Sequence, residues 1–207
     1  MAAACAANLM ADSRALTYSK AAEDLRTGMA EHLWDEESGR FVRRLVSKAP
    51  DDTGADYSRD MTIDSAVHAV WAFGAFAPDD PRVRSTMKSA LTRLWVRTEV
   101  GGVARYEDDY YFRRVADIDN VPGNPWIICT LWAAQWYIAQ AATRAELATA
   151  LDILLWACER AGSTGILPEQ VHPETGEHLS VSPLTWSHAE FVSTVLDYAE
   201  KFKSLAD

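Results

Sequence analysis

The spacing of apolar residues, which recur three and four positions apart over long stretches, restricts the fold of this chain more than any other feature. Sustained alternation of apolar and polar residues, which would indicate strands, is almost absent. A spacing of three and four places the apolar side chains on one face of an α-helix. We therefore predict an all-α fold, with helices over about residues 18–33, 62–76, 82–100, 125–142, 144–160 and 183–202.

The connections between these helices are of two kinds. The step from Ala142 to Arg144 is short, as between antiparallel neighbours, whereas residues 100–124 and 162–182 are long and irregular. Long ordered loops are uncommon in a compact helical domain unless they have a function. The pattern predicts helical hairpins that stack side by side, with the functional loops at one end. Because no low-complexity linker or block of charge divides the chain, we expect residues 1–207 to form a single α-helical domain.

Charge and aromatic content narrow the choice of ligand. Thirty acidic and twenty basic side chains give a formal net charge of −10, and no basic patch stands out, so we expect no nucleic-acid partner. The chain also has eight tryptophans, more than a core of this size needs. Surplus aromatic rings suit a cleft that binds sugars or other rings. A helical core that is simply rich in tryptophan is an equal alternative on composition alone.

The cysteines and the N-terminal stretch bear on the cellular compartment. Cys5, Cys129 and Cys158 are widely spaced and form no CxxC pair, which fits a reducing compartment better than a disulfide framework. Residues 1–10 lack the basic and long apolar regions of a signal peptide. No uncharged apolar run approaches the roughly 18 residues that a membrane span needs. We therefore expect a cytoplasmic protein with no membrane partner.

A metal or nucleotide site is not expected. His172 and His178 share a loop with Glu174 and Glu177, but their spacing matches neither HExxH nor a zinc-finger pattern. The sequence also has no P-loop, no GxGxxG, no GxSxG and no catalytic-cysteine signature. We predict neither a metal nor a cofactor.

The first long loop carries an unusual concentration of polar groups. Between Gly101 and Tyr111 the sequence places Arg105, three acidic residues and three tyrosines. The guanidinium of Arg105, with Asp108 or Asp109 as acceptor, can hold the vicinal hydroxyls of a sugar. The alternative is a surface ion pair in a tyrosine-rich loop that joins two helices.

The second long loop contains the best general-base candidate, Glu169, which lies between a proline and Gln170. To act as a base, Glu169 must stay ionised and hold a water near the reacting carbon, which needs a polar, preorganised pocket. The alternative is a helix cap or an exposed glutamate. Elsewhere, Asn-Pro before Trp126 sets up a helix start at which the indole ring can face a ligand or the core. His188, early in the last helix, is expected to form a supporting hydrogen bond rather than to carry a proton.

Taken in order, four motifs resemble the glucoamylase family, glycoside hydrolase family 15. They are GGVARY with DYY, GNPW with CTLW, LPEQ, and PLTWSHA, and the resemblance covers roughly residues 101–198. It implies an (α/α)6 toroid of helical hairpins, of which this chain would form about half. It also implies inverting hydrolysis of a terminal α-linked glucose by two carboxylates, with malto-oligosaccharides, starch or trehalose as substrates.

The resemblance assigns roles to individual residues. Glu169 matches the general base of the family's Pro-Glu-Gln or Ser-Glu-Gln motif. Arg105 and Asp109 match the residues that grip the terminal glucose. The other positions expected to bind the substrate are Tyr106, Trp126, Gln170 and Trp186.

The chain departs from the family in having about half the helices. The half that we expect to be missing is N-terminal, and in the family it supplies the general acid in a Trp-Glu context. The stretch Trp34-Asp35-Glu36-Glu37 is a tempting substitute, but it follows a helix and precedes Gly39, so we interpret it as a solvent-facing turn. We therefore expect feeble hydrolysis by the isolated chain, and a homodimer or a partner chain that supplies the N-terminal half. The alternative is a non-catalytic sugar-binding helical subunit or a pseudoenzyme fragment.

Overall fold

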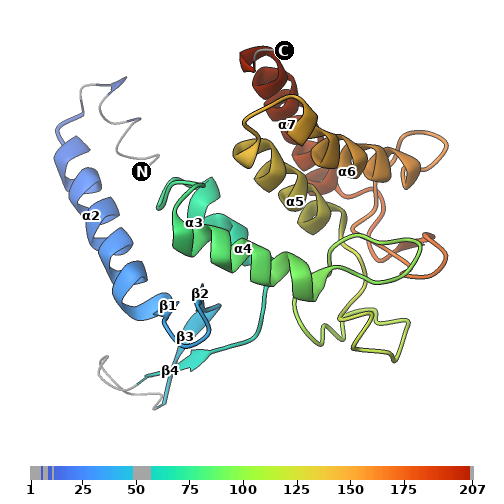
Figure 1. Ribbon diagram of the computed structural model, residues 1–207, viewed down its shortest axis with the longest axis horizontal. Coiled ribbons are helices and arrows are strands. Elements are labelled where there is room, and N and C mark those ends of the chain that lie inside the picture. The colour runs from blue at the N-terminus through green and yellow to red at the C-terminus, as the bar shows by residue number, and fades with distance from the viewer. Residues whose placement is uncertain (1–5, 7–8, 11, 49–56, 206–207) are drawn as a thin grey trace. The chain divides into compact units, whose positions relative to one another are not determined.

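The computed structural model describes residues 6, 9–10, 12–48 and 57–205 (Figure 1). Contacts within the chain divide it into two compact units. The N-terminal unit comprises residues 1–62 and 67–89, and the C-terminal unit comprises residues 63–66 and 90–207. The expectation of a single domain stays a prediction. Cys5 lies outside the described residues, and so does most of the stretch 1–10, on which the expectation of no signal peptide rests.

The N-terminal unit combines helices with two small hairpins. Its first helix, α2 (Ala15–Gly28), continues into a π-helical turn, η1 (Met29–Leu33). Two antiparallel hairpins follow, formed by β1 (Trp34–Asp35) with β2 (Arg40–Phe41) and by β3 (Arg44–Ser47) with β4 (Tyr57–Asp60). The chain then forms the 3-10 turn η2 (Ser65–His68), α3 (Ala69–Ala72) and α4 (Pro81–Leu94). Both η2 and α4 run from one unit into the other. The small core of the N-terminal unit includes Phe41, Phe76 and Val83.

The hairpins are a feature that the sequence pattern did not predict. Their strands have two to four residues, too few for an alternating pattern to be recognised. The helix expected over residues 62–76 is also shorter than predicted, because only η2 and α3 are helical there. Helices still dominate the described chain, so the all-α fold class holds.

The acidic stretch between β1 and β2 forms a turn. Asp35 accepts hydrogen bonds from the backbone N–H and the Oγ of Ser38, at 2.8 and 2.6 Å. Arg59 donates to the same carboxylate at 2.8 Å. Glu36 and Glu37 are exposed at the tip of the turn. The interpretation as a solvent-facing turn is therefore confirmed for Glu36 and Glu37, whereas Trp34 and Asp35 form the half-buried strand β1.

The C-terminal unit is built on three helices that lie side by side (Figure 1). They are α5 (Ile127–Gln140), α6 (Ala148–Glu159), which follows the 3-10 turn η3 (Ala145–Leu147), and α7 (Thr185–Ser204). Helix α5 packs against both of the others and buries residues all around its axis, among them Leu131 and Ala134. The three helices expected in this region are confirmed. A third hairpin, β5 (Gln170–Val171) with β6 (His178–Leu179), lies in the second long loop.

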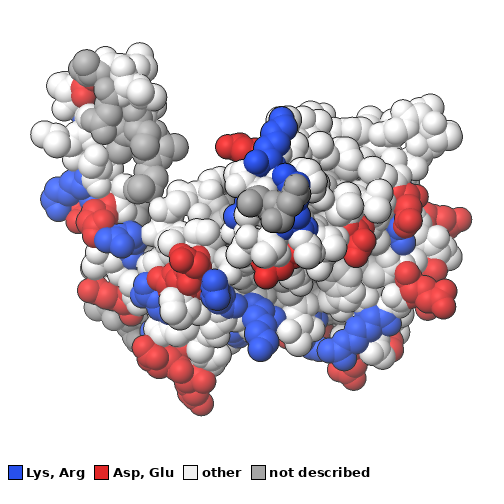
Figure 2. Space-filling view, turned by 45° about the horizontal axis from the view of Figure 1, so that its top comes forward, with Lys and Arg blue, Asp and Glu red and all other residues white. Residues whose placement is uncertain are grey.

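The surface shows no segregation of charge on the face drawn in Figure 2, where basic side chains are interspersed with acidic ones. The expectation of no nucleic-acid partner stays a prediction. Within the described ranges, no helix combines the length and the apolar character needed to cross a bilayer.

Candidate active site

The two long loops meet at the start of α5, where main-chain hydrogen bonds join three segments. The N–H of Trp126 donates to the carbonyl of Val103 at 2.9 Å, and the N–H of Ile127 donates to the carbonyl of Glu169 at 3.1 Å. An isolated β-bridge also pairs Trp126 with Gln170. The segment at the start of α5 therefore lies between the first long loop and the second, and backbone bonds fix the register of all three.

A close contact at Gly102 anchors the first loop. The φ of Gly102 is +91°, and a Cβ at this position would lie 2.6 Å from Cζ2 of Trp156. Only glycine adopts such a backbone conformation at little cost. The indole N–H of Trp156 donates to the carbonyl of Val100 at 2.6 Å. Helix α6 thus holds the backbone just before Arg105.

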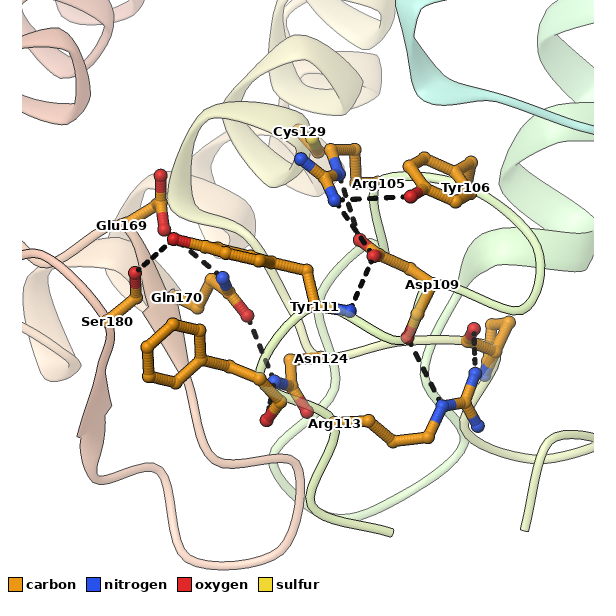
Figure 3. Close-up of polar contacts among 12 residues, drawn as sticks. Arg105, Tyr106, Asp109, Tyr111, Arg113, Asn124, Cys129, Glu169, Gln170 and Ser180 are labelled. Carbon is orange, nitrogen blue, oxygen red and sulfur yellow. Dashed lines mark hydrogen bonds and ion pairs between the residues drawn. The ribbon is translucent and has the colours of Figure 1, made fainter. Parts of the chain in front are cut away.

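Arg105 and Asp109 form a two-pronged ion pair (Figure 3). Nε and Nη2 of Arg105 donate to the two carboxylate oxygens of Asp109 at 2.9 and 2.8 Å. The side chain of Asp109 is 1% exposed, whereas that of Arg105 is 32% exposed. The pair is therefore not a surface ion pair, because its carboxylate is buried. Partial burial opposes the charge on Arg105, but the hydrogen bonds and the negative charge of Asp109 outweigh it and raise the pKa of the guanidinium.

Aromatic rings lie around this guanidinium. Its Cζ atom is 4.5 Å from the ring centre of Trp126, 4.8 Å from that of Tyr106 and 5.3 Å from that of Tyr111. Trp126 is buried, whereas Tyr111 is partly exposed. The Nη2 of Arg105 also donates to the hydroxyl of Tyr106 at 3.4 Å. Arg105, Tyr106, Asp109 and Trp126, predicted separately from the sequence, are thus brought into one cluster that combines a cation with apolar ring faces.

The beginning of α7 holds the loop that carries Glu169. The N–H of Leu167 donates to Nε2 of His188 at 3.1 Å, and the Oγ of Ser187 donates to the carbonyl of Pro168 at 2.7 Å. The N–H of Glu169 itself donates to the carbonyl of Val181 at 2.8 Å. His188 therefore supports the loop through a hydrogen bond, as the sequence indicated. Hydrogen bonds therefore fix the backbone of residues 167–169, from which the Glu169 side chain extends.

A chain of amide hydrogen bonds orients the carboxylate of Glu169 (Figure 3). The Nδ2 of Asn124 donates to Oε1 of Gln170 at 2.9 Å, and Nε2 of Gln170 donates to Oε2 of Glu169 at 3.2 Å. Asn124 and Gln170 are fully buried, and Glu169 is half-buried. Glu169 is therefore neither a helix cap nor a freely exposed glutamate. Its carboxylate has one oriented oxygen and partial access to solvent.

Two buried polar atoms beside the cluster have no hydrogen-bond partner among the described residues. They are Nε1 of Trp126 and Oδ1 of Asn124. An unsatisfied buried donor or acceptor costs about 1–3 kcal/mol, so such atoms are rare and often mark a functional site.

Trp186, in the first turn of α7, contacts residues of α5 and α7. The ring of Trp186 packs edge-on against Trp132 of α5 at 6.0 Å between ring centres. Its indole N–H donates to Oε2 of Glu190 at 3.3 Å, and 52% of its surface is exposed. These contacts do not include Arg105 or Glu169. Its role in binding the substrate stays a prediction.

Cys129 lies beside the guanidinium of Arg105 and is a neutral thiol (Figure 3). Burial is the largest cause that raises the pKa of this thiol to about 12. The Oγ of Ser65 donates to its sulfur at 3.1 Å. Among the residues that the structure describes, no group of three or more His, Cys, Asp or Glu is placed to hold a metal ion.

Sequence reasoning did not single out three residues that hold the site together, Asn124, Ser187 and Arg113. Asn124 lies in a motif that indicated only a helix start, and Ser187 is adjacent to His188, so both lay within reach of the motif analysis. Arg113 is one of two adjacent arginines in the loop, and no pattern distinguishes it. Its role depends on carbonyl groups that only the folded loop brings together.

Comparison with known proteins gives a consistent result. Residues 1–196 match the family model described as glycosyl hydrolases family 15. An uncharacterized glycosyl hydrolase of Methanocaldococcus jannaschii is 27% identical over 190 residues, which cover 87% of this chain and 27% of that protein.

Two solved structures illustrate the likeness in fold. A bacterial glucoamylase complexed with acarbose has a TM-score of 0.74 at 22% identity, over 99% of this chain and 34% of its own. The glucoamylase from Saccharomycopsis fibuligera has a TM-score of 0.68 at 18% identity, over 99% of this chain and 54% of its own. The helical hairpins of this chain therefore correspond to part of an (α/α)6 toroid. The chain spans between about a quarter and about half of the length of these proteins.

Proposed function

The chain belongs to glycosyl hydrolases family 15, and on this premise we propose that it is a glucoamylase-like module of an inverting glycoside hydrolase. Its substrates would carry a terminal α-linked glucose, as malto-oligosaccharides, starch and trehalose do. The observation that carries the proposal is the register of three segments, which brings the Arg105–Asp109 pair, the ring of Trp126 and the loop of Glu169 to one place.

The Arg105 cluster suits a sugar because it offers both kinds of contact that a glucose ring needs. Arg105 stays charged and keeps about a third of its side chain exposed, while Asp109 fixes the plane of its guanidinium. Donors held in a fixed fork bind pairs of adjacent hydroxyls. The rings of Tyr106, Tyr111 and Trp126 supply apolar faces.

In this proposal Glu169 is the general base. One carboxylate oxygen accepts a hydrogen bond from Gln170, so the other is free to accept a proton from water. In an inverting glycosidase the water attacks the anomeric carbon while a second carboxyl group protonates the leaving oxygen, and the two groups lie about 6.5–9.5 Å apart. Glu36 and Glu37 lie in an exposed turn of the other unit, so neither is our candidate for that acid.

We therefore propose that the general acid comes from a polypeptide segment outside these 207 residues. A separate N-terminal-half chain would supply it, and either that chain or a second copy of this one would cover apolar surface, such as Leu16 of α2, which is 83% exposed. A cytoplasmic location is part of the same proposal, because the free thiols of Cys129 and Cys158 fit a reducing compartment.

The test measures release of β-glucose from maltose, trehalose and starch by the wild-type chain and by Glu169→Gln, each with the N-terminal half of a relative added to supply the general acid. Loss of a general base lowers the rate by about 10²–10⁴-fold. Glu174→Gln is the matched control, because Glu174 is an exposed carboxylate of the same loop and should leave activity unchanged. Equal activity of the wild type and Glu169→Gln would remove Glu169 from the mechanism.

Calorimetry with glucose, maltose and acarbose separates the proposed enzyme from its alternative. An enzyme module binds these ligands and turns over maltose once the N-terminal half of a relative is added. A non-catalytic sugar-binding subunit or pseudoenzyme fragment binds without turnover, even when the N-terminal half of a relative is added. A wild-type chain that binds none of the three ligands would refute both.

A further inference from the structure

Arg113 lies in the loop between the Arg105 cluster and the start of α5, and its donors go to backbone carbonyls. Its Nε donates to the carbonyl of Asp109 at 3.2 Å, and its Nη2 donates to that of Pro122 at 2.9 Å (Figure 3). A longer bond of 3.5 Å joins Nη1 to the carbonyl of Val115. The guanidinium also stacks on the ring of Tyr110, at 4.9 Å from its centre.

These contacts join Asp109 to Pro122 and so close a neck at the base of the loop segment between them. The N–H of Asp109 also donates to the carbonyl of Pro122, at 3.1 Å. The neck is tightly packed, since a Cβ on Gly123 would lie only 3.0 Å from Cβ of Asp109. Arg113 thus spans two backbone segments that are thirteen positions apart along the chain.

Each side of the neck carries one half of the proposed site. On one side, the carboxylate of Asp109 holds Arg105. On the other side, Asn124 follows the neck directly and begins the amide chain through Gln170 to Glu169. A change in the width of the neck would therefore move the sugar-gripping arginine relative to the general base.

We propose that Arg113 is a positioning residue that keeps the Arg105 grip and the Glu169 carboxylate at the separation that one glucose requires. The inference rests on the proposed function. Arg113 contacts no substrate in this account. An arginine is required because its planar fork bonds two carbonyls at once, whereas the ammonium group of lysine is a single point of charge on a flexible stem.

The experiment measures the affinity of the full chain for acarbose and glucose by calorimetry, in the wild type, Arg113→Ala and Arg113→Lys. A hydrogen bond to a charged group contributes enough that its loss should weaken binding by about tenfold. Arg113→Lys should recover little of this loss. Arg114→Ala is the matched control, because Arg114 is exposed in the same loop. The affinity of this variant for acarbose should stay within about twofold of that of the wild type.

Chemical rescue distinguishes positioning from a general loss of folding. Millimolar methylguanidinium added to Arg113→Ala should restore much of the affinity, because it can occupy the same carbonyls. Hydrogen exchange tests the positioning role without a sugar ligand. The N–H groups of Tyr111 and Ile127 form hydrogen bonds on either side of the neck. Both should exchange faster in Arg113→Ala than in the wild type, whereas Arg114→Ala should leave both rates unchanged.

Three outcomes would overturn the inference. Wild-type affinity in Arg113→Ala would show that the clamp is not needed. A loss of affinity that methylguanidinium does not restore, with exchange accelerated throughout the C-terminal unit, would show a purely structural role. A wild-type chain that binds neither sugar would refute the proposed function itself, whereas wild-type binding that survives Arg113→Ala would refute only the role of Arg113.

Discussion

The helices α2 and α5 each have 14 residues but differ widely in how many of these residues are buried. In α5 nine residues are buried, distributed all around the helix. In α2 only Ala15 is buried, and the apolar side chains of Leu16 and Leu25 are largely exposed. A helix that is apolar on all sides must be surrounded by protein, whereas one with a polar surface and a narrow apolar stripe need not be. The comparison teaches that helical periodicity locates a helix but does not say how much stability the helix contributes.

The two units share one kind of hydrogen bond, from a backbone N–H to the hydroxyl oxygen of a helical threonine. In the C-terminal unit, Oγ1 of Thr130 accepts a hydrogen bond from the N–H of Val103 at 2.9 Å. In the N-terminal unit, Oγ1 of Thr86 accepts one from the N–H of Phe41, also at 2.9 Å. Each threonine lies on a helix and satisfies a buried backbone donor of a neighbouring segment, which is strand β2 in the N-terminal unit and the first long loop in the C-terminal unit. Only in the C-terminal unit does that segment lead to the candidate site.

Leucine truncation should separate the two units most strongly. Leu131→Ala removes a fully buried side chain of α5 and should lower the free energy of unfolding by about 3–5 kcal/mol. Leu25→Ala removes a side chain that is 69% exposed and should change it by no more than about 0.5 kcal/mol. Urea unfolding followed by circular dichroism measures both. A large loss in Leu25→Ala would mean that this face of α2 is covered in solution, which would contradict the contrast drawn between the helices.

Glycine replacement should act in opposite directions in the two units. Gly102→Ala forces a Cβ into a left-handed position and against Trp156, and should destabilise the chain by about 2–3 kcal/mol. Gly28→Ala lies at the end of α2 with φ of −60° and no atom within 4 Å of the added Cβ, and should stabilise it by up to about 1 kcal/mol. Thermal unfolding gives the sign of each effect. Two effects of equal sign would disprove the prediction.

The smallest effect is an opposite response to pH. Hydrogen bonds from Ser38, and then the contact with Arg59, lower the pKa of Asp35 in the N-terminal unit. The stability that Asp35 contributes is therefore present above its unfolded pKa of about 4 and is lost as the pH falls through its lower folded pKa. Partial burial, and then the charges of Glu200 and Glu190, raise the pKa of Asp197 in the C-terminal unit. Ionised Asp197 therefore opposes folding at neutral pH.

Asparagine variants test this difference. At pH 7, Asp35→Asn should lower the melting temperature, whereas Asp197→Asn should raise it. The difference for Asp197 should vanish below the unfolded pKa of about 4, whereas the difference for Asp35 should vanish only below its lower folded pKa, because each carboxyl group must be protonated in both the folded and the unfolded chain. Melting temperatures measured between pH 3 and pH 8 supply the comparison. A difference for Asp197→Asn that persists at pH 3, or a difference for Asp35→Asn that does not shrink as the pH falls, would assign the effect to packing instead of charge.

Much of the fold follows from local pattern, and the exceptions have a physical cause. The helices of the C-terminal unit were predicted because their bonds join residues four apart, so that the signal lies within one short segment. The three hairpins were not predicted, because strands of two to four residues carry too little pattern. The helix over 62–76 is shorter than predicted because the segment from Ile63 to Ser65 bonds instead to Arg105 and Glu107 in the first long loop.

The candidate site divides in the same way. The order of motifs identified Arg105, Tyr106, Asp109, Trp126, Glu169 and Gln170, which the fold brings together. For Trp186, from the same set of motifs, the contacts are with Trp132 and Glu190, and its role in binding stays a prediction. Arg113 gave no signal, because its partners are backbone carbonyls and every residue has one.

By itself, the sequence determined the kinds of groups available and the helices that carry them, since both depend on neighbours along the chain. Only the tertiary structure decided that Glu169 is adjacent to Trp126, that Asp109 is buried beneath its arginine, and that a loop neck links the two. Those relations depend on hydrogen bonds between segments tens of residues apart, and such bonds form only when the packing of α5, α6 and α7 has brought the loops to one end.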